Sequence, residues 1–428
     1  MSTTDIKSIR GFVDILPERS RVWSFLEETA ARVFELYGFS QIRTPVLEFT
    51  DLYSRGVGET TDIVEKEMYS FTDKDGSEIT LRPEGTAGVV RAFIENSLHN
   101  SPGAQKLWYS GEMFRHERPQ KGRMRGFHQI GAEFFGSDAA SEDCEIIAML
   151  WHFFTEAGIS DGLEIEINSM GTPDDRDTFK NALSQFLSPL QENLCDNCAR
   201  RARKNPLRVF DCKNPDCAAL IENAPVMSEF LSAENARHFE DVKERLTALS
   251  VPFVVNEKIV RGLDYYTRTV FEVKAAKGLG AQNAVAAGGR YDLLVEKFGG
   301  SPTPATGFAI GVERAALLLE GSKNESGKEA EVFVGWIGEV CFNSAFALCA
   351  TLRGRGVKTR IEHSASGIKG QMKKADKSGA RIMVIIGPDE MKKSVVKIRD
   401  MKTGDEKELP EKGAAEYISN SVKSGGNS

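Results

Sequence analysis

The chain has 428 residues, enough for two or three domains that each bury a core. Its 41% hydrophobic and 27% charged residues are ordinary for a soluble globular protein. The sequence lacks the run of about 18 apolar residues that a membrane-spanning helix needs, and its first residues lack the apolar core of a secretory signal, so we expect a cytoplasmic protein. A formal net charge of −7 gives no support on its own for nucleic-acid binding.

The first third of the chain is predicted to contain one helix and several strands. Pro17 suits a first helical position and Gly38 suits a C-terminal stop, so a helix is expected over Pro17–Tyr37. The sequence QIRTPVLEF is typical of a strand, and Gly- and charge-rich loops are expected over residues 54–88. Residues 106–136 alternate apolar and polar at both ends, which predicts two antiparallel strands joined by a long basic loop.

The middle of the chain is predicted to be a helical insert between strands. A helix is expected over about residues 139–157, a strand over 163–171, and mainly helices over about 172–253. Strands should return in VRGLDYYTRTVFEV and AVAAGGRYDLLVEKF, and ATGFAIGVERAALLLE is typical of a strand, a glycine break and a helix.

The C-terminal segment is predicted to be a separate domain. The sequence GSKNESGKEAE has no apolar face and is typical of a linker. Beyond it, strands alternate with helices over about 342–353 and 367–379, which predicts an α/β domain with a parallel sheet. From residue 331 onward there are 17 Lys and Arg against 12 Asp and Glu, a net +5, so residues 1–330 carry −12. A basic module on an acidic body is therefore expected.

Four of the seven cysteines cluster in the helical insert, at positions Cys195, Cys198, Cys212 and Cys217. The first pair has the C-x2-C spacing of a zinc knuckle, but thirteen residues separate the second cysteine from the third. A chain of this size in a reducing compartment needs no disulfides. Reduced cysteines are therefore favoured over a structural zinc ion, and no metal site is expected with confidence.

A charged hairpin within Phe114–Glu133 is the most informative segment. Its charged residues are Arg115, Glu117, Arg118, Lys121, Arg123, Arg125 and Glu133. Arginine suits phosphate because its planar fork donates two parallel bonds, while Glu117 and Phe127 offer an acceptor and a flat ring to a purine. The alternative is a solvated loop.

A second group of residues surrounds two glycine-rich junctions. Arg314 follows Gly307 and Gly311 at the start of a predicted helix, where the helix dipole favours a phosphate. Neither G-x-G-x-x-G nor G-K-[ST] is present, which excludes dinucleotide and P-loop sites, and a purely structural junction is the alternative. The segment VRGLDYY could likewise be a turn with half-buried tyrosines.

These segments together resemble a known family. The F-R-x-E hairpin and the later G-x-x-x-G-x-E-R resemble motifs 2 and 3 of class II aminoacyl-tRNA synthetases, and RTPVLEF is compatible with motif 1, whose Pro45 would lie at a dimer interface. LRPEGTAG, RGLDYY and AAGGRYDLL resemble signatures of histidyl-tRNA synthetases, in the expected order over nearly the whole chain. The resemblance implies an α+β catalytic domain with a mixed, mainly antiparallel sheet flanked by helices over 1–325. It also implies a helical insertion at about 172–253 and an anticodon-binding α/β domain over 331–428.

The resemblance further implies the reaction. Such an enzyme activates L-histidine with ATP to histidyl-adenylate and pyrophosphate, with Mg²⁺ accompanying ATP. It then transfers histidine to the 3′-terminal ribose of tRNA-His. A homodimer is implied by the family and by motif 1.

Site residues follow from the same resemblance. Arg261 and Arg115 would be catalytic, at the α-phosphate that the histidine carboxylate attacks. Arg123 and Arg314 would bind toward the γ-phosphate, with Phe127 and Glu117 on adenine. The histidine pocket would be lined by Glu84, Thr86, Gln129, Glu133, Tyr265 and Tyr266. Glu133 would accept the imidazole N–H, and a tyrosine hydroxyl would serve the other nitrogen. Arg118 and Gln120 would meet the acceptor end of the tRNA.

Two other functions are compatible with part of this pattern. One is a non-catalytic relative that binds histidine or tRNA, which would be expected to lose the phosphate-binding arginines or the C-terminal domain. The other is a class II synthetase for a different amino acid. A carboxylate at Glu133 argues against an apolar substrate, since the carboxylate would be left unpaired.

Overall fold

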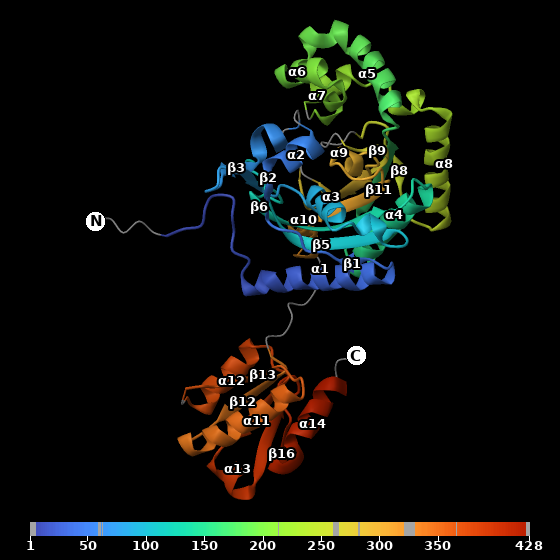
Figure 1. Cartoon of the computed structure of the whole chain (residues 1–428). Helices are drawn as coiled ribbons and strands as arrows, with labels where there is room; N and C mark the ends of the chain where they lie inside the picture. The colour runs from blue at the N-terminus through green and yellow to red at the C-terminus, as the bar shows by residue number, and fades with distance from the viewer. Residues whose placement is uncertain are drawn as a thin grey trace, which may run out of the picture. The chain divides into compact units, whose positions relative to one another are not determined.

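The computed structural model describes two compact units, Met1–Asn324 and Glu325–Ser428 (Figure 1). The described residues are 6–58, 61, 63–212, 214–259, 265–280, 283–320, 330–364 and 366–424. Within them, no helix is both long enough and apolar enough to cross a bilayer.

An eight-stranded sheet forms the centre of the first unit. Its order is β1-β5-β6-β11-β10-β9-β7-β8, and the six inner strands pair antiparallel, while the two edge pairings are parallel. The mixed, mainly antiparallel sheet expected from the sequence is confirmed. The strands are β1 (Ser40–Gln41), β5 (Gln105–Phe114), β6 (Gly126–Phe135), β7 (Leu163–Ser169), β8 (Val254–Val255), β9 (Thr267–Ala275), β10 (Ala284–Arg290) and β11 (Ala305–Gly311).

Four helices pack on one face of this sheet and form the main core. They are α1 (Pro17–Leu36), α4 (Ala140–Glu156), α8 (Ala233–Ala248) and α10 (Val312–Glu320). Their buried side chains meet alternate residues of the strands, such as Ile130 and Phe134 of β6 and Phe308 of β11. Because successive residues of a strand point to opposite faces, the intervening residues of β6 and β11 face the other side.

The predicted helices and strands of the first unit, including the helix that begins at Pro17, are confirmed except between residues 41 and 88. The expected strand QIRTPVLEF is two short strands in different sheets, β1 and β2 (Leu47–Phe49). The expected loops over 54–88 are wrong. That segment holds the end of α2 (Thr50–Val57), a π-helical turn (Ile63–Glu67), a hairpin of β3 (Tyr69–Thr72) and β4 (Glu78–Leu81), and the start of α3 (Thr86–Glu95). The hairpin pairs with β2, and strands of three or four residues carry too little periodicity to be recognised alone.

The insert between β7 and β8 is helical, as expected, and its α5–α7 part is seen at the top of Figure 1. It begins with α5 (Pro173–Leu187), whose N-terminus is a capping box between Thr172 and Asp175. Short helices follow: η3 (Ser188–Asn193), α6 (Asp196–Lys204), η4 (Pro206–Asp211), α7 (Pro215–Leu220) and η5 (Met227–Phe230). The long helix α8 then returns to pack against α4.

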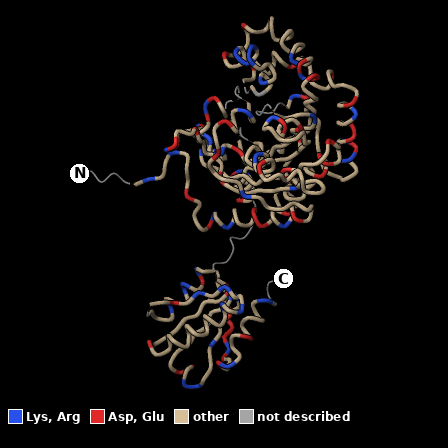
Figure 2. Tube along the Cα trace, viewed as in Figure 1, with Lys and Arg blue, Asp and Glu red and all other residues tan. Residues whose placement is uncertain are grey.

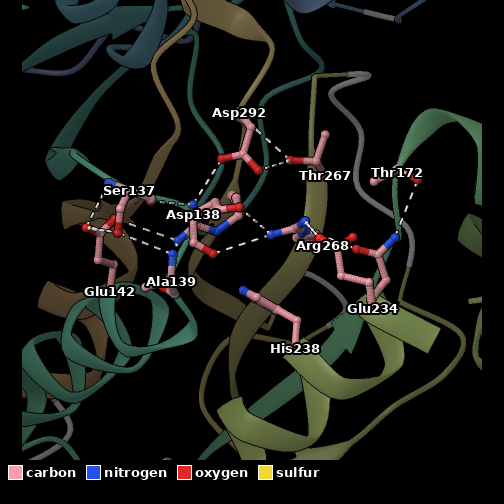
Figure 3. A network of polar contacts seen from close by, with 12 residues as sticks. Ser137, Asp138, Ala139, Glu142, Thr172, Glu234, His238, Thr267, Arg268 and Asp292 are labelled. Carbon is pink, nitrogen blue, oxygen red and sulfur yellow. Dashed lines mark hydrogen bonds and ion pairs between the residues drawn. The ribbon is translucent and has the colours of Figure 1, made fainter. Parts of the chain in front are cut away.

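A buried ionic network ties the sheet to α4. The guanidinium of Arg290 is fully buried and bonds the Asp143 carboxylate at 2.9–3.0 Å, Asp292 at 3.0 Å and the Ser137 carbonyl at 2.9 Å. Nearby, Arg268 lies between Asp138 and Glu234 (Figure 3), at 3.2 and 2.6 Å, and so joins β9 to α8. Asp143 is also fully buried, so its charge depends on Arg290 for compensation.

The second unit is a five-stranded sheet of order β13-β12-β14-β15-β16. Its elements are β12 (Val332–Trp336), α11 (Phe342–Gly354), β13 (Thr359–Ile361), α12 (Ile368–Lys377), β14 (Ile382–Ile386), α13 (Pro388–Lys393), β15 (Val395–Asp400), β16 (Glu406–Pro410) and α14 (Glu411–Ser424). In Figure 2 its basic and acidic residues are interspersed along the trace.

The expected all-parallel sheet of this unit is wrong. Strands β13, β12 and β14 are parallel, but β14 pairs antiparallel with β15, and β15 with β16. Only eight residues separate β14 from β15, fewer than the dozen or so that a parallel crossover requires. The chain therefore turns back beside β14.

We expect Arg290→Met to lower the free energy of unfolding of the first unit by about 3–5 kcal/mol, because it leaves the buried Asp143 uncompensated. The control Arg399→Met removes an arginine that pairs with Glu406 at 2.7 Å on the surface of the second unit and should cost less than about 1 kcal/mol. Urea unfolding followed by tryptophan fluorescence measures both. Equal losses in the two variants would contradict the importance of the buried network.

Candidate active site

A cavity of about 250 Å³ opens on the face of the large sheet that α1 and α4 do not cover. Strands β6, β10 and β11 form its floor, and the starts of α3 and α10 and the β5–β6 loop contribute to its walls. Eleven residues expected at the site from the sequence line it: Glu84, Thr86, Arg115, Glu117, Arg123, Phe127, Gln129, Glu133, Tyr265, Tyr266 and Arg314.

Three expected residues are not among the described residues that line the cavity. Arg261, expected at the α-phosphate, is outside the described residues. Arg118 and Gln120 are exposed on the β5–β6 loop and do not line the cavity. Gln120 instead forms an isolated backbone bridge with Arg123, at 2.9 and 3.0 Å, which closes the loop.

Glu133 lies at the buried end of the cavity. Its carboxylate accepts hydrogen bonds from the Tyr291 hydroxyl at 2.5 Å and from the Thr86 hydroxyl at 2.7 Å, and the side chain is fully buried. Burial raises its pKa to about 8, although these two hydrogen bonds oppose the shift. Gly307 of β11 is the residue paired with Glu133 of β6. A Cβ at Gly307 would collide with the Glu133 carboxylate, so the glycine leaves the space that the carboxylate occupies.

Two further acceptors line the cavity. The Glu84 carboxylate accepts from the backbone N–H groups of Thr86 and Ala87, at 2.7 and 2.8 Å, and so caps the start of α3. Burial raises the pKa of Glu84. The side-chain oxygen of Gln129 is buried and has no hydrogen-bond partner within the described part of the chain. A buried acceptor without a donor is costly, which favours a ligand that supplies one.

Three arginines, Arg115, Arg123 and Arg314, also line the cavity. Arg115 donates to the Pro83 carbonyl at 2.8 Å, and its guanidinium lies 5.2 Å from the centre of the Phe127 ring. Arg314, at the start of α10, donates to the Gly122 carbonyl at 2.9 Å. Burial, and then the charges of Arg123 and Arg115, lower the pKa of Arg314. Positive groups that lower one another's pKa in this way are stabilised by an anion.

Arg123 also forms an ion pair with Glu117, which is 8% exposed. Among the described lining residues there is no histidine, cysteine, serine or lysine. Apart from the Thr86 hydroxyl bonded to Glu133, this set offers charge stabilisation and positioning.

The sequence did not single out Tyr291 as a site residue. It lies in the AAGGRYDLL segment, and its ring packs against Tyr265 at 5.7 Å between centroids while its hydroxyl reaches Glu133. The sequence could have identified Tyr291 only by its place in that segment, directly after Arg290, which anchors β10. Tyr109 is a second residue that the sequence did not single out. Its ring fills the space left by the missing side chains of Gly85 and Gly131.

The fold and the cavity define a class of protein. An antiparallel sheet that brings an F-R-x-E hairpin and a G-x-x-x-G-x-E-R junction to one cavity is the arrangement of a class II aminoacyl-tRNA synthetase. A family model described as histidyl-tRNA synthetase matches residues 11–315, and one described as anticodon binding domain matches residues 331–421. The chain belongs to the histidyl-tRNA synthetase family.

Individual relatives are similar over nearly their full length. A histidine–tRNA ligase of Halothermothrix orenii is 46% identical over 95% of this chain and 97% of its own. One of Desulfitobacterium hafniense is 44% identical over 99% of this chain and 100% of its own. The crystal structure of apo S. aureus histidyl-tRNA synthetase superposes with a TM-score of 0.81 at 34% identity, covering 97% of this chain and 100% of that one.

The raised pKa of Glu133 predicts a pH-dependent stability difference. The unfolded chain loses the Glu133 proton near its usual pKa of 4.5 and the folded chain near 8, so the wild type loses stability as the pH rises between these values. Glu133→Gln removes this dependence. Its free energy of unfolding relative to the wild type should increase from pH 5 to pH 8 by up to about 1.4 kcal/mol per pH unit. Urea unfolding at several pH values measures this difference, and parallel pH profiles would contradict the assignment.

Proposed function

We propose that the chain is a histidine–tRNA ligase that acts in the cytoplasm. It forms histidyl-adenylate and pyrophosphate from L-histidine and ATP, then transfers histidine to the 3′-terminal ribose of tRNA-His. The observation that carries this proposal is that one cavity is lined both by the buried acceptors Glu84, Gln129 and Glu133 and by Arg115, Arg123 and Arg314. Such a cavity suits an amino acid with a hydrogen-bonding side chain placed against a polyphosphate.

Histidine occupies the part of the cavity that contains Glu133. Neutral imidazole has one donor and one acceptor, so Glu133 accepts its N–H and a hydroxyl of Tyr265 or Tyr266 donates to the other nitrogen. Both tyrosines line the cavity and are 6% and 7% exposed. A donor arriving next to the Glu133 carboxylate lowers its raised pKa, so binding favours the ionised form.

The α-amino and carboxylate end of histidine lies nearer the arginines. Glu84, Thr86 and Gln129 hold this end, and the unpartnered oxygen of Gln129 is placed to accept from the ammonium group. A pocket built from paired polar groups rejects analogues that leave those groups unpaired, which gives selectivity without a tight steric fit.

ATP, with its Mg²⁺, occupies the part lined by the arginines. Arg115 and Arg261 bind the α-phosphate, and Arg123 and Arg314 bind toward the γ-phosphate. The free face of Phe127 stacks on adenine and Glu117 contacts its edge. Arg123 also pairs with Glu117, so its donors would be shared between that carboxylate and a phosphate.

The reaction requires no covalent enzyme intermediate. A carboxylate oxygen of histidine attacks the α-phosphorus, the bond to the pyrophosphate oxygen breaks, and the arginines stabilise the charge on the phosphoryl oxygens. The terminal ribose hydroxyl of the tRNA then attacks the activated carbonyl and releases AMP. Holding the reactants in one cavity supplies much of the acceleration.

The remaining parts of the chain serve the tRNA and the assembly. Residues 1–325 are the catalytic domain, with the helical insertion at about 172–253. The second unit reads the anticodon, and Arg118 and Gln120 meet the acceptor end. A homodimer forms through the motif 1 region around Pro45. This proposed dimer is supported by exposed apolar side chains beside that region. They are Val46, Leu47 and Phe49, together with Phe71 of the same three-stranded sheet as Leu47 and Phe49.

Two rival functions are less well supported. A non-catalytic relative would have no use for Arg115, Arg123 and Arg314 in one cavity, and this chain keeps all three together with the second unit. A synthetase for an apolar amino acid would leave the Glu133 carboxylate facing a ligand without a donor.

Histidine-dependent ATP–pyrophosphate exchange tests the proposed activity directly. The wild type should exchange with histidine alone among the amino acids, and Arg261→Ala should lower kcat by about 10²–10³-fold, since it removes charge stabilisation at the α-phosphate. The matched control is Arg32→Ala, on the surface of α1 beside Glu156, which should leave the rate unchanged. A folded wild type without exchange would sink the proposal in favour of a binding or regulatory protein.

The histidine pocket is tested by Glu133→Gln in the same assay. The value of kcat/KM for histidine should fall by about 10- to 100-fold, because a hydrogen bond to a charged group contributes about 1.5–3 kcal/mol, while KM for ATP stays within about threefold. Glu142→Gln is the control, since that partly buried carboxylate lies outside the cavity. Unchanged histidine activation in Glu133→Gln would show that the imidazole binds elsewhere.

A further inference from the structure

The four cysteines of the helical insert converge, although they are spread over 23 positions of the sequence. Cys195 precedes α6, Cys198 lies in its first turn, Cys212 follows η4, and Cys217 lies in α7. All four sulfur atoms lie within 4.8 Å of one another, and the sulfurs of Cys195 and Cys212 are 3.9 Å apart. None of the four forms a disulfide.

This spacing fits a single tetrahedral metal ion. With zinc–sulfur bonds of about 2.3 Å, the sulfurs of a four-thiolate site lie about 3.8 Å from one another. A disulfide would instead bring two sulfurs to about 2.05 Å. In a four-iron cluster each cysteine binds a different iron, so the sulfurs would have to lie farther apart than here.

The backbone around the cysteines is arranged for thiolates. The N–H of Cys195 donates to the sulfur of Cys217 at 3.3 Å, and the N–H of Asn214 donates to the sulfur of Cys212 at 3.5 Å. Such bonds stabilise negative charge on sulfur. Five basic residues lie close in sequence and would offset the net charge of −2 on a four-thiolate zinc site: Arg200, Arg201, Arg203, Lys204 and Arg208.

The local fold has a structural use for such an ion. Between α5 and η5 the described part of the chain forms short helices of six to nine residues, which are too short to be stable on their own. They add buried side chains such as Leu194, Ala202, Leu207 and Val209 to a core cluster that they share with α5. A metal ion that joins α6, α7 and the end of η4 would fasten these short helices directly to one another.

We propose that Cys195, Cys198, Cys212 and Cys217 bind one zinc ion in a structural site. With four protein ligands the ion has no open position for substrate, so its role is to hold the insert together. The sequence favoured reduced, unligated cysteines because their spacing is irregular. The tertiary structure favours the zinc site instead, because the lengths of the loops and helices bring the four sulfur atoms around one point. This inference is independent of the proposed ligase activity.

The metal content of the full chain, purified under reducing conditions without chelator, tests the site. Mass spectrometry of the elements should find one zinc ion per chain, released by a mercurial reagent that blocks thiols. The double variant Cys198→Ser/Cys217→Ser should hold fewer than about 0.1 zinc ion per chain. Cys349→Ala, a buried cysteine of the second unit, is the control and should keep its zinc.

A second measurement covers the case in which the double variant does not fold. Zinc is stripped from the wild type with a chelator and then restored. Trypsin cleavage at the basic residues of α6 should speed up by about tenfold or more without zinc and slow again on reloading, because the ion orders this segment. A wild type that takes up no zinc even after reloading would overturn the proposal. So would zinc content unchanged in the cysteine variant, or a native disulfide between any two of the four cysteines.

Discussion

The alternation of side chains along the central antiparallel strands is the constraint on which the rest of the first unit depends. On β6, Ile130 and Phe134 enter the core beneath α1 and α4, which places Gln129 and Glu133 on the opposite face. A shift of one residue in register would bury a carboxylate in the core and expose a phenylalanine in the cavity. The pairing of Glu133 with Gly307 on β11 holds this register and also leaves the space that the carboxylate needs.

The electrostatics of the site follow from that geometry. The carboxylates of Glu84 and Glu133 are buried and lie among hydroxyl and N–H donors, whereas Arg115, Arg123 and Arg314 come from the β5–β6 loop and the start of α10. The paired strands β6 and β11 fix Glu133, while the loop and the helix start fix the arginines, so acidic and basic groups are held in one cavity without moving. Charged groups held in place in this way are preorganised, because little reorganisation is needed when a charged ligand binds.

Buried polar anchors add to the apolar packing that joins α4 and α8 to the sheet. Arg290 holds the start of α4 against β10, and Arg268 joins β9 to α8 across the base of the insert. The proposed zinc site would play a similar part among the short helices of the insert. In each case a few strong, directional interactions fix the positions of neighbouring elements.

Much of this protein was determined by local sequence. The helix at Pro17, the hairpin of β5 and β6 and the strand–helix junction before Arg314 were predicted because periodicity and capping residues are local signals. Eleven of the expected site residues line one cavity because they lie in motifs whose order and spacing are recognisable.

The tertiary structure decided what depends on long-range contacts. Tyr291 reaches Glu133 across 158 positions, residues expected to be loop pair as β3 and β4 only beside β2, and β15 turns antiparallel because its connection is short. Four cysteines with irregular spacing share one centre for the same reason, since the distance between side chains far apart in sequence is set by how the elements pack.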